Sequence, residues 1–171
     1  MTRIISYREI EDVEGFRPQN GMNFQTKSKN YSIVLMSVRE DAPYQDKISE
    51  DGKTIDYVGH NLNKRYCNGK DPNTLDQPLF LPSGKLTENG KFAKAANYFK
   101  DGLQQSEKIR AYQKIKSGIW SFNGVFDLVD VAQEKSNNRI VHLFKLILTN
   151  EKVEDFQDEN NDLPDDDRVI P

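Results

Sequence analysis

Cysteine and histidine are scarce in this chain of 171 residues, which contains one cysteine and two histidines. A single cysteine excludes a disulfide within the chain, and three such residues are too few for a four-ligand zinc site of cysteine and histidine. Apolar runs are also short, and none approaches the ~18 residues that a membrane-spanning helix needs. No apolar stretch follows the first residues, so we expect no signal peptide. These absences predict a soluble, cytoplasmic protein with no metal, no cofactor and no membrane partner.

The formal charge of −3 is unevenly distributed along the sequence. Residues 150–171 contain nine acidic side chains and two basic ones, which is a local charge of −7. Residues 1–149 therefore carry +4, since the two parts together give −3. A modestly basic body is compatible with binding to nucleic acid, which the total charge alone would argue against.

The acidic end of the chain is also poor in apolar residues, as is typical of a linker that cannot join a core. We therefore predict one folded domain over residues 1–149 and an acidic linker over residues 150–171. The linker is expected to pack poorly and to be dispensable for recognition.

Strand patterns dominate the predicted domain. Apolar and β-branched residues fill residues 31–38, and an alternating pattern covers residues 54–59. Later runs of the same kind cover residues 119–122, 124–131 and 139–148. We expect successive antiparallel strands, some of them buried on both faces.

One helix is clearly indicated between these strands. Thr87 is a suitable N-cap. Phe92 and Phe99 recur at helical spacing, which predicts a helix over residues 88–100. A second helix is expected over about residues 7–13. Many strands and few helices predict an α+β fold, with a compact β-barrel-like sheet and a few flanking helices.

Several segments, in chain order between residues 29 and 149, resemble motifs of the SRA (SET and RING associated) domain family. Residues 31–35 (YSIVL) are similar to the family's YSVVL strand, and residues 57–59 (YVG) to its YTG strand. Residues 44–46 stand at its acidic YEDD loop, and residues 86–93 (LTENGKFA) resemble its LTxxNxAL helix start. The remaining matches are to its later strands, at residues 108–112, 120–129 and 141–146.

This resemblance implies an SRA-like or PUA-like barrel that binds double-stranded DNA and flips a 5-modified cytosine into an aromatic pocket. Flipping costs ~a few kcal/mol of unstacking, and stacking on aromatic side chains offsets this by ~1–3 kcal/mol each. A carboxylate accepts a hydrogen bond from the cytosine amine, which thymine lacks. The chain itself would do no chemistry, and 5-methylcytosine and 5-hydroxymethylcytosine are both expected ligands.

The resemblance also implies which residues form the pocket. Tyr44 and Tyr57 would stack on the flipped base, and Asp46 would accept from its exocyclic amine. Without the resemblance, a tyrosine beside a turn is more often a packing residue, and an aspartate there is more often a turn or cap residue.

The segment after Tyr57 contributes the rest of the pocket but departs from the family pattern. Gly59 would let the backbone approach the base closely. His60 and Asn61 would lie near the 5-substituent or the flipped phosphate. Val58 replaces the family's threonine and His60 its small serine, so the contacts around the 5-position stay open.

Two further sets of residues follow from the resemblance. A loop near the helix start would fill the space that the flipped base leaves, with Asn89, Lys91 and Lys94 as candidates. Phosphates would be held by basic side chains of the body. These are Lys27, Lys29, Lys64, Arg65, Lys85, Lys108 and Arg110.

Residues 168–171, after the acidic linker, resemble the lead-in to the HNH nuclease domain of modification-dependent restriction enzymes. We therefore expect this chain to be the recognition module of such an endonuclease, without its nuclease domain. Any homodimer would form through that absent domain.

Other functions stay open. A nuclease within the chain would need acidic-plus-lysine sites such as Asp46-Lys47 or residues 50–53, although the latter are more typical of a turn. A reader of RNA or of another modified base, from the wider PUA-like group, would share the barrel. A protein-interaction module has no support beyond the acidic tail.

Overall fold

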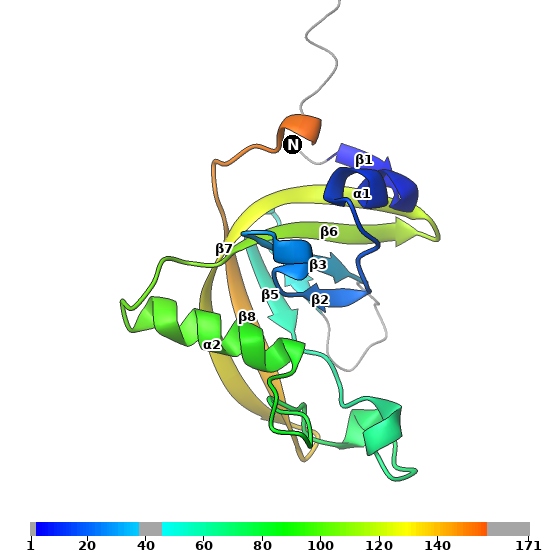
Figure 1. Ribbon diagram of the computed structural model, residues 1–171, viewed down its shortest axis with the longest axis vertical. Coiled ribbons are helices and arrows are strands. Elements are labelled where there is room, and N and C mark those ends of the chain that lie inside the picture. Colours follow the sequence, from blue (N-terminus) through cyan, green and yellow to red (C-terminus); the bar gives the residue numbers. More distant parts are fainter. Residues whose placement is uncertain (1–2, 38–45, 157–171) are drawn as a thin grey trace, which may run out of the picture.

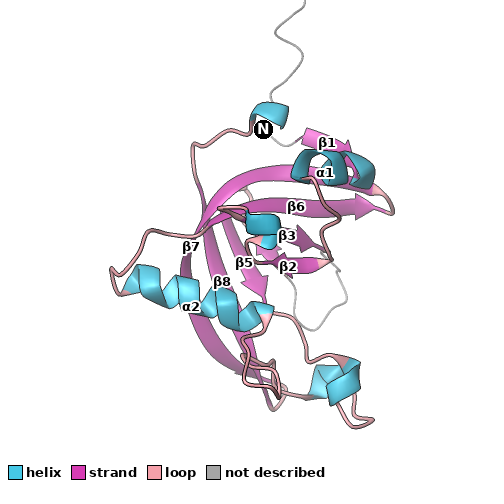
Figure 2. Ribbon diagram, in the orientation of Figure 1, coloured by secondary structure: helices cyan, strands magenta, loops and turns pink. Residues whose placement is uncertain are grey.

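The structure is a computed structural model that describes residues 3–37 and 46–156 (Figures 1 and 2). Its described part contains an eight-stranded mixed sheet and two α-helices, which confirms the predicted α+β class. The helices are α1 (Tyr7–Glu14) and α2 (Glu88–Lys100). The strands are β1 (Arg3–Ser6), β2 (Gly21–Asn23), β3 (Ser32–Met36), β4 (Lys47–Ile48), β5 (Thr54–Val58), β6 (Lys108–Lys116), β7 (Ile119–Ser136) and β8 (Arg139–Leu148).

The strands follow the order β2-β3-β6-β7-β8-β5-β4, and β1 pairs with the first residues of β7. Every pair is antiparallel except β3 with β6. Within the described residues the outer strands β2 and β4 do not pair, so the sheet is curved but not closed, unlike the predicted barrel. These two strands have three and two residues, too few backbone groups for a closing ladder.

β7 joins two segments that the sequence pattern separates. Ala111 pairs with Gly124 and Tyr112 with Phe122, so Asn123 is the extra residue of a bulge. Gly124 has φ 123°, and a Cβ there would lie 2.7 Å from Leu148 Cδ1. The bulge bends the strand without ending it, and one 18-residue strand therefore serves β1, β6 and β8.

Both helices begin at the caps that their sequences provide. Thr87 Oγ1 accepts from the Gly90 amide at 3.1 Å, which confirms the predicted start of α2. Ser6 and Glu9 form a capping box at α1, which ends at Gly15 with φ 75°. Neither helix, nor any other in the described part, has the length and apolar content to cross a bilayer.

Strand β3 separates two hydrophobic cores, because its alternate side chains face opposite ways. Val34 and Met36 join the core beneath α2, called the α2-side core here. Ile33 and Leu35 join the core beneath α1, called the α1-side core. All five residues of β3 are buried, as the apolar run predicts for a strand covered on both faces.

The α1-side core includes residues from the segment predicted to be a linker. Val153 is buried, and the Phe156 ring stacks on Phe122 with centroids 4.4 Å apart. Arg3 donates to the Asp155 carbonyl at 3.0 Å. The packed body therefore extends seven residues beyond the predicted boundary at 149, because two apolar residues among the acids suffice to anchor the chain. Residues 157–171 lie outside the described part.

Candidate nucleic-acid interface

The candidate base pocket lies where β5 ends. Asp46 precedes β4, and its Oδ1 accepts from the Val58 amide at 2.9 Å. Burial raises the pKa of the Asp46 carboxyl to about 6, against a smaller opposing effect of the Val58 hydrogen bond. A carboxylate held in this way has acceptor capacity left for a ligand amine. Tyr44, the other predicted loop residue, lies outside the described residues.

Tyr57 lies within β5 and not on a loop. Its side chain belongs to the α2-side core and is 5% exposed. Burial, and then the nearby charge of Asp46, raise the pKa of its hydroxyl well above the ordinary value. A Cβ at Gly21 would lie 3.3 Å from this hydroxyl, so the glycine makes room for it. A base that stacks on Tyr57 therefore has to displace atoms that now cover the ring.

The backbone after β5 is held by buried side-chain amides. Gln77 Nε2 donates to the Gly59 carbonyl at 2.6 Å, and the Gly59 amide donates to the His142 carbonyl at 2.8 Å. The His60 amide donates to Asn89 Oδ1 at 3.0 Å, and Asn89 Nδ2 returns a bond to the His60 carbonyl at 2.9 Å. The four peptide groups of Gly59 and His60 are thus all satisfied by the protein itself.

This arrangement explains the glycine at position 59. A Cβ there would lie 2.6 Å from Asn89 Oδ1 and 2.9 Å from Gln77 Oε1, both closer than real Cβ contacts. The structure therefore requires glycine to admit these two amides. The predicted close approach of a base to Gly59 stays a prediction.

The insertion of Asn89 into DNA stays a prediction, and in this structure its side chain is bonded within the protein. Asn89 lies in the first turn of α2, is 0% exposed and bonds to His60 and to the Pro78 carbonyl. The motif places an asparagine at the helix start, but the helix turns that side chain inward. Lys91 and Lys94 are on α2 rather than on a loop, with Lys91 paired to Glu88 at 3.1 Å.

A second layer supports the same segment. Arg139 Nη1 donates to Asn61 Oδ1 at 2.7 Å, and Asn61 Nδ2 donates to Asn73. The His142 amide donates to Gln77 Oε1, and its ring Nε2 lies 3.0 Å from the Gln77 carbonyl. Burial lowers the pKa of His142, which favours the neutral ring. We call the four residues around Gly59–Asn61 the Gly59 clamp; they are Gln77, Asn89, Arg139 and His142.

Two of the predicted phosphate contacts have structural partners instead. Arg110 donates to Glu14 at 2.9 Å and lies over the Tyr31 ring, 3.9 Å from its centroid. Tyr31 and Tyr112 hydroxyls also donate to Glu14, each at 2.6 Å, and Glu14 has no exposed surface. We call these four residues the Glu14 cluster; Arg110 is bonded within it, and its contact with a phosphate stays a prediction.

Lys108 is likewise paired, with Asp127 on the neighbouring strand, because the antiparallel register places the two residues opposite each other. Lys27 and Lys29 lie in and beside a 3₁₀ turn in which Gln25, Lys27 and Ser28 have positive φ. The other predicted contacts, Lys64, Arg65 and Lys85, are exposed; the first two lie in a 3₁₀ turn and Lys85 lies in a loop. These five stay predictions.

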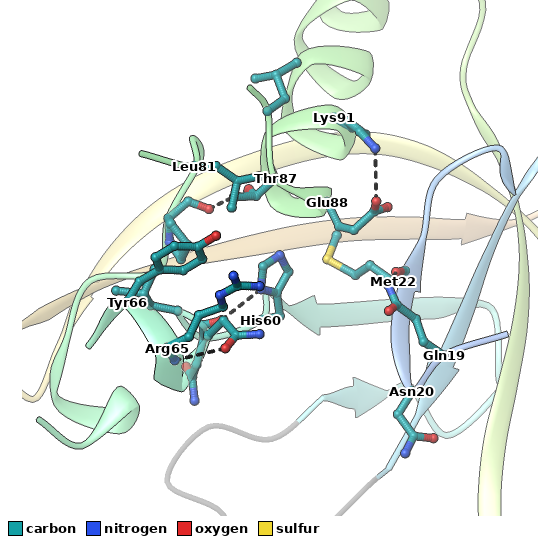
Figure 3. Close-up of a pocket in the computed structure, with 15 residues that line it drawn as sticks. Gln19, Asn20, Met22, His60, Arg65, Tyr66, Leu81, Thr87, Glu88 and Lys91 are labelled. Atoms are coloured by element: carbon teal, nitrogen blue, oxygen red, sulfur yellow. Dashed lines mark hydrogen bonds and ion pairs between the residues drawn. The ribbon is translucent and has the colours of Figure 1, made fainter. Parts of the chain in front are cut away.

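A cavity of about 530 Å³ opens beside the clamped segment (Figure 3). Residues 60–66 form one wall, residues 19–22 another, and the start of α2 a third. Within the described residues no group of three histidine, cysteine or acidic side chains is placed to hold a metal ion.

Sequence reasoning missed the Gly59 clamp and the Glu14 cluster, although isolated signals exist. Arg139 and His142 interrupt the apolar pattern of β8, and both are buried. A buried polar residue needs a partner, so each interruption marks a site to explain. The sequence offers no indication of which partners they find.

Comparison with known proteins gives structural likeness only. No family model and no curated protein matches the sequence. The fold is similar to that of the SUVH5 SRA domain bound to fully hydroxymethylated CG DNA. That match has 19% identity, covers 90% of this chain and 91% of the other, and has a TM-score of 0.59.

Two further solved structures are similar. The SUVH5 SRA domain with hemi-methylated CG DNA matches at 19% identity over 88% of each chain, with a TM-score of 0.56. KRYPTONITE in complex with mCHH DNA, an H3(1–15) peptide and SAH matches at 16% identity over 93% of this chain and 34% of the other, also at 0.56. The chain therefore has the fold of an SRA domain, as its motifs predict.

Proposed function

We propose that this chain binds double-stranded DNA carrying a 5-modified cytosine and takes the flipped base into the pocket at the end of β5. The observation that carries the proposal is Asp46, a partly buried carboxylate beside Tyr57 and the clamped Gly59–His60 backbone. The similar SUVH5 structures hold methylated and hydroxymethylated DNA, which supports the same ligand class here.

The chemistry of Asp46 suits cytosine better than the other pyrimidine. Cytosine presents an amine donor where thymine presents an acceptor oxygen. A partly buried carboxylate such as Asp46 therefore gains a hydrogen bond from cytosine and repels thymine. Rigid backbone at Gly59–His60 lowers the entropy that binding has to remove from the pocket.

In this proposal the chain is a recognition domain and does no chemistry, and Tyr44 and Tyr57 stack on the base. The half-buried Lys91 and the exposed Lys94 fill or border the gap in the duplex. Phosphates are contacted by Lys27, Lys29, Lys64, Arg65 and Lys85. We further propose that the chain directs an HNH restriction endonuclease to modified DNA.

The test is titration of wild type against duplexes that differ only in the cytosine 5-substituent, with an RNA duplex alongside. Modified DNA should bind most tightly, and preference for RNA would favour the PUA-like alternative. Asp46→Ala should lose more affinity than Asp46→Asn, because the amide oxygen still accepts.

Base flipping has its own readout. Tyr44→Ala and Tyr57→Ala should each cost ~1–3 kcal/mol of affinity for modified DNA and leave plain DNA nearly unchanged. A fluorescent base analogue at the modified position should change its emission on binding. Tight, modification-dependent binding with unchanged emission contradicts flipping.

A further inference from the structure

The cavity beside the Gly59 clamp is much larger than a methyl group requires. Its volume of about 530 Å³ lies within the ~300–1,000 Å³ of small-molecule sites. In Figure 3, Arg65 and Tyr66 face it from one side, Gln19 and Met22 from the opposite side, and Glu88 with Lys91 from the start of α2. His60 lies between these walls, so the clamped segment forms part of the cavity.

The lining offers hydrogen-bonding groups over an apolar base. Within the part of the chain that the structure describes, three side-chain groups of the lining make no hydrogen bond: the Asn20 amide, the Tyr66 hydroxyl and the Arg65 guanidinium. The guanidinium lies 5.2 Å from the centroid of the Tyr66 ring. Leu81 and Leu86 supply apolar surface. Donors and acceptors around an aromatic and aliphatic surface suit a ligand that carries several hydroxyl groups on a saturated ring, such as a sugar.

The cavity begins close to the residues that are proposed to read the C4 edge of the cytosine. The amine that Asp46 would accept from is on C4 of cytosine, and the 5-substituent is on the adjacent ring carbon. Asp46 is bonded to the Val58 amide, two residues before His60. A large 5-substituent that points along the chain towards His60 would enter the cavity, which His60 and Asn61 line.

We propose that this cavity receives a hexosyl or similar polyhydroxylated group carried on the 5-position, so that the preferred mark is glycosylated 5-hydroxymethylcytosine. The inference rests on the proposed function. A methyl group would leave the cavity filled with water and would gain nothing from its polar lining. A hexosyl group displaces that water and forms hydrogen bonds with Asn20 and Tyr66, which the proposed function leaves unassigned.

The experiment compares four duplexes that are identical except for cytosine, 5-methylcytosine, 5-hydroxymethylcytosine or glucosyl-5-hydroxymethylcytosine at one site. The glucosylated duplex should bind at least tenfold more tightly than the methylated one. Leu81→Trp, which narrows the cavity, should abolish that advantage and leave binding of the methylated duplex unchanged. Tyr66→Phe should reduce the advantage severalfold, whereas Tyr98→Phe on the outer part of α2 is the matched control.

The outcomes separate the two proposals. If methylated DNA binds as tightly as glucosylated DNA or more tightly, the inference is overturned and the proposed function stands. Equal loss for all four duplexes in Leu81→Trp would mean that the cavity holds the DNA backbone, which also overturns it. If no modification raises affinity over plain cytosine, the proposed function itself fails.

Discussion

The Glu14 cluster and the Gly59 clamp are both sets of buried polar residues, but the first joins side chains to one another and the second joins side chains to backbone. In the Glu14 cluster, side chains bind one another, and the bonds tie α1 to strand β6. In the Gly59 clamp, side-chain amides bind backbone at the mouth of the candidate pocket. The first uses formal charges and the second uses mainly neutral groups. The comparison indicates that polar groups on the α1 side of the sheet join elements of the fold, whereas those on the α2 side hold the backbone of the candidate site.

The largest expected effect is on the fold side of this comparison. Glu14→Ala leaves Arg110 and two tyrosine hydroxyls without their shared acceptor, so the free energy of unfolding should fall by ~3–5 kcal/mol. Urea denaturation measures the loss. The ratio of affinities for modified and plain DNA should stay within twofold in the remaining folded protein. A loss below 1 kcal/mol would show that the cluster is not a structural element.

Val153 and Phe156 anchor the C-terminal segment to the α1-side core, so their removal should also lower the free energy of unfolding. A chain ending at Asn150 loses Val153 and Phe156 from the α1-side core and should unfold ~2–4 kcal/mol more easily. A chain ending at residue 157 keeps both and is the control. Thermal and urea unfolding compare the two, and equal stability would restore the sequence-based boundary at 149.

Breaking the Gly59 clamp should instead lower affinity for modified DNA more than affinity for plain DNA. Asn89→Ala removes both bonds to the His60 peptide groups, and affinity for modified DNA should fall by ~1–2 kcal/mol while plain DNA binds within twofold of wild type. Asn97→Ala is the matched control, since Asn97 is exposed on the same helix. Parallel loss of both affinities would assign Asn89 to the fold and not to the site.

The smallest expected effect is a dependence of DNA affinity on pH, which arises from Asp46 in the candidate site. Since the pKa of Asp46 is raised to about 6, the carboxyl becomes protonated below that pH and loses acceptor strength. Affinity for modified DNA should fall by up to ~tenfold between pH 7 and 5, and Asp46→Asn should remove this dependence.

The same raised pKa has a consequence for stability. The folded protein binds this proton more tightly than the unfolded chain, so the contribution of Asp46 to stability rises as pH falls from 6 towards 3.8. Asp46→Asn should therefore stabilise the protein at pH 7 by ~0.5–1 kcal/mol, since solvent screens part of the charge of this partly exposed carboxyl. A destabilised variant in urea denaturation would contradict the burial of the charge.

The sequence predicts those elements whose signals are local. Helix α2 and strands β5 and β8 lie where periodicity and caps place them. Short strands such as β1, β2 and β4 were missed, because two to four residues are too few to show a period. In the candidate site, Asp46 comes from a motif. The inward bonds of Asn89 could not be predicted, because the motif does not record which way a side chain turns.

By itself, the sequence determined the α+β class, the burial of β3 on both faces and the capped helix α2, since each depends on residues within a few positions. Only the tertiary structure decided that Arg110 meets Glu14, 96 residues away, and that Arg139 reaches Asn61 across 78 residues. It also decided that the acidic segment contributes Phe156 to a core. Such contacts depend on the order in which strands pair, and a buried polar side chain takes whichever partner that order brings within hydrogen-bond distance.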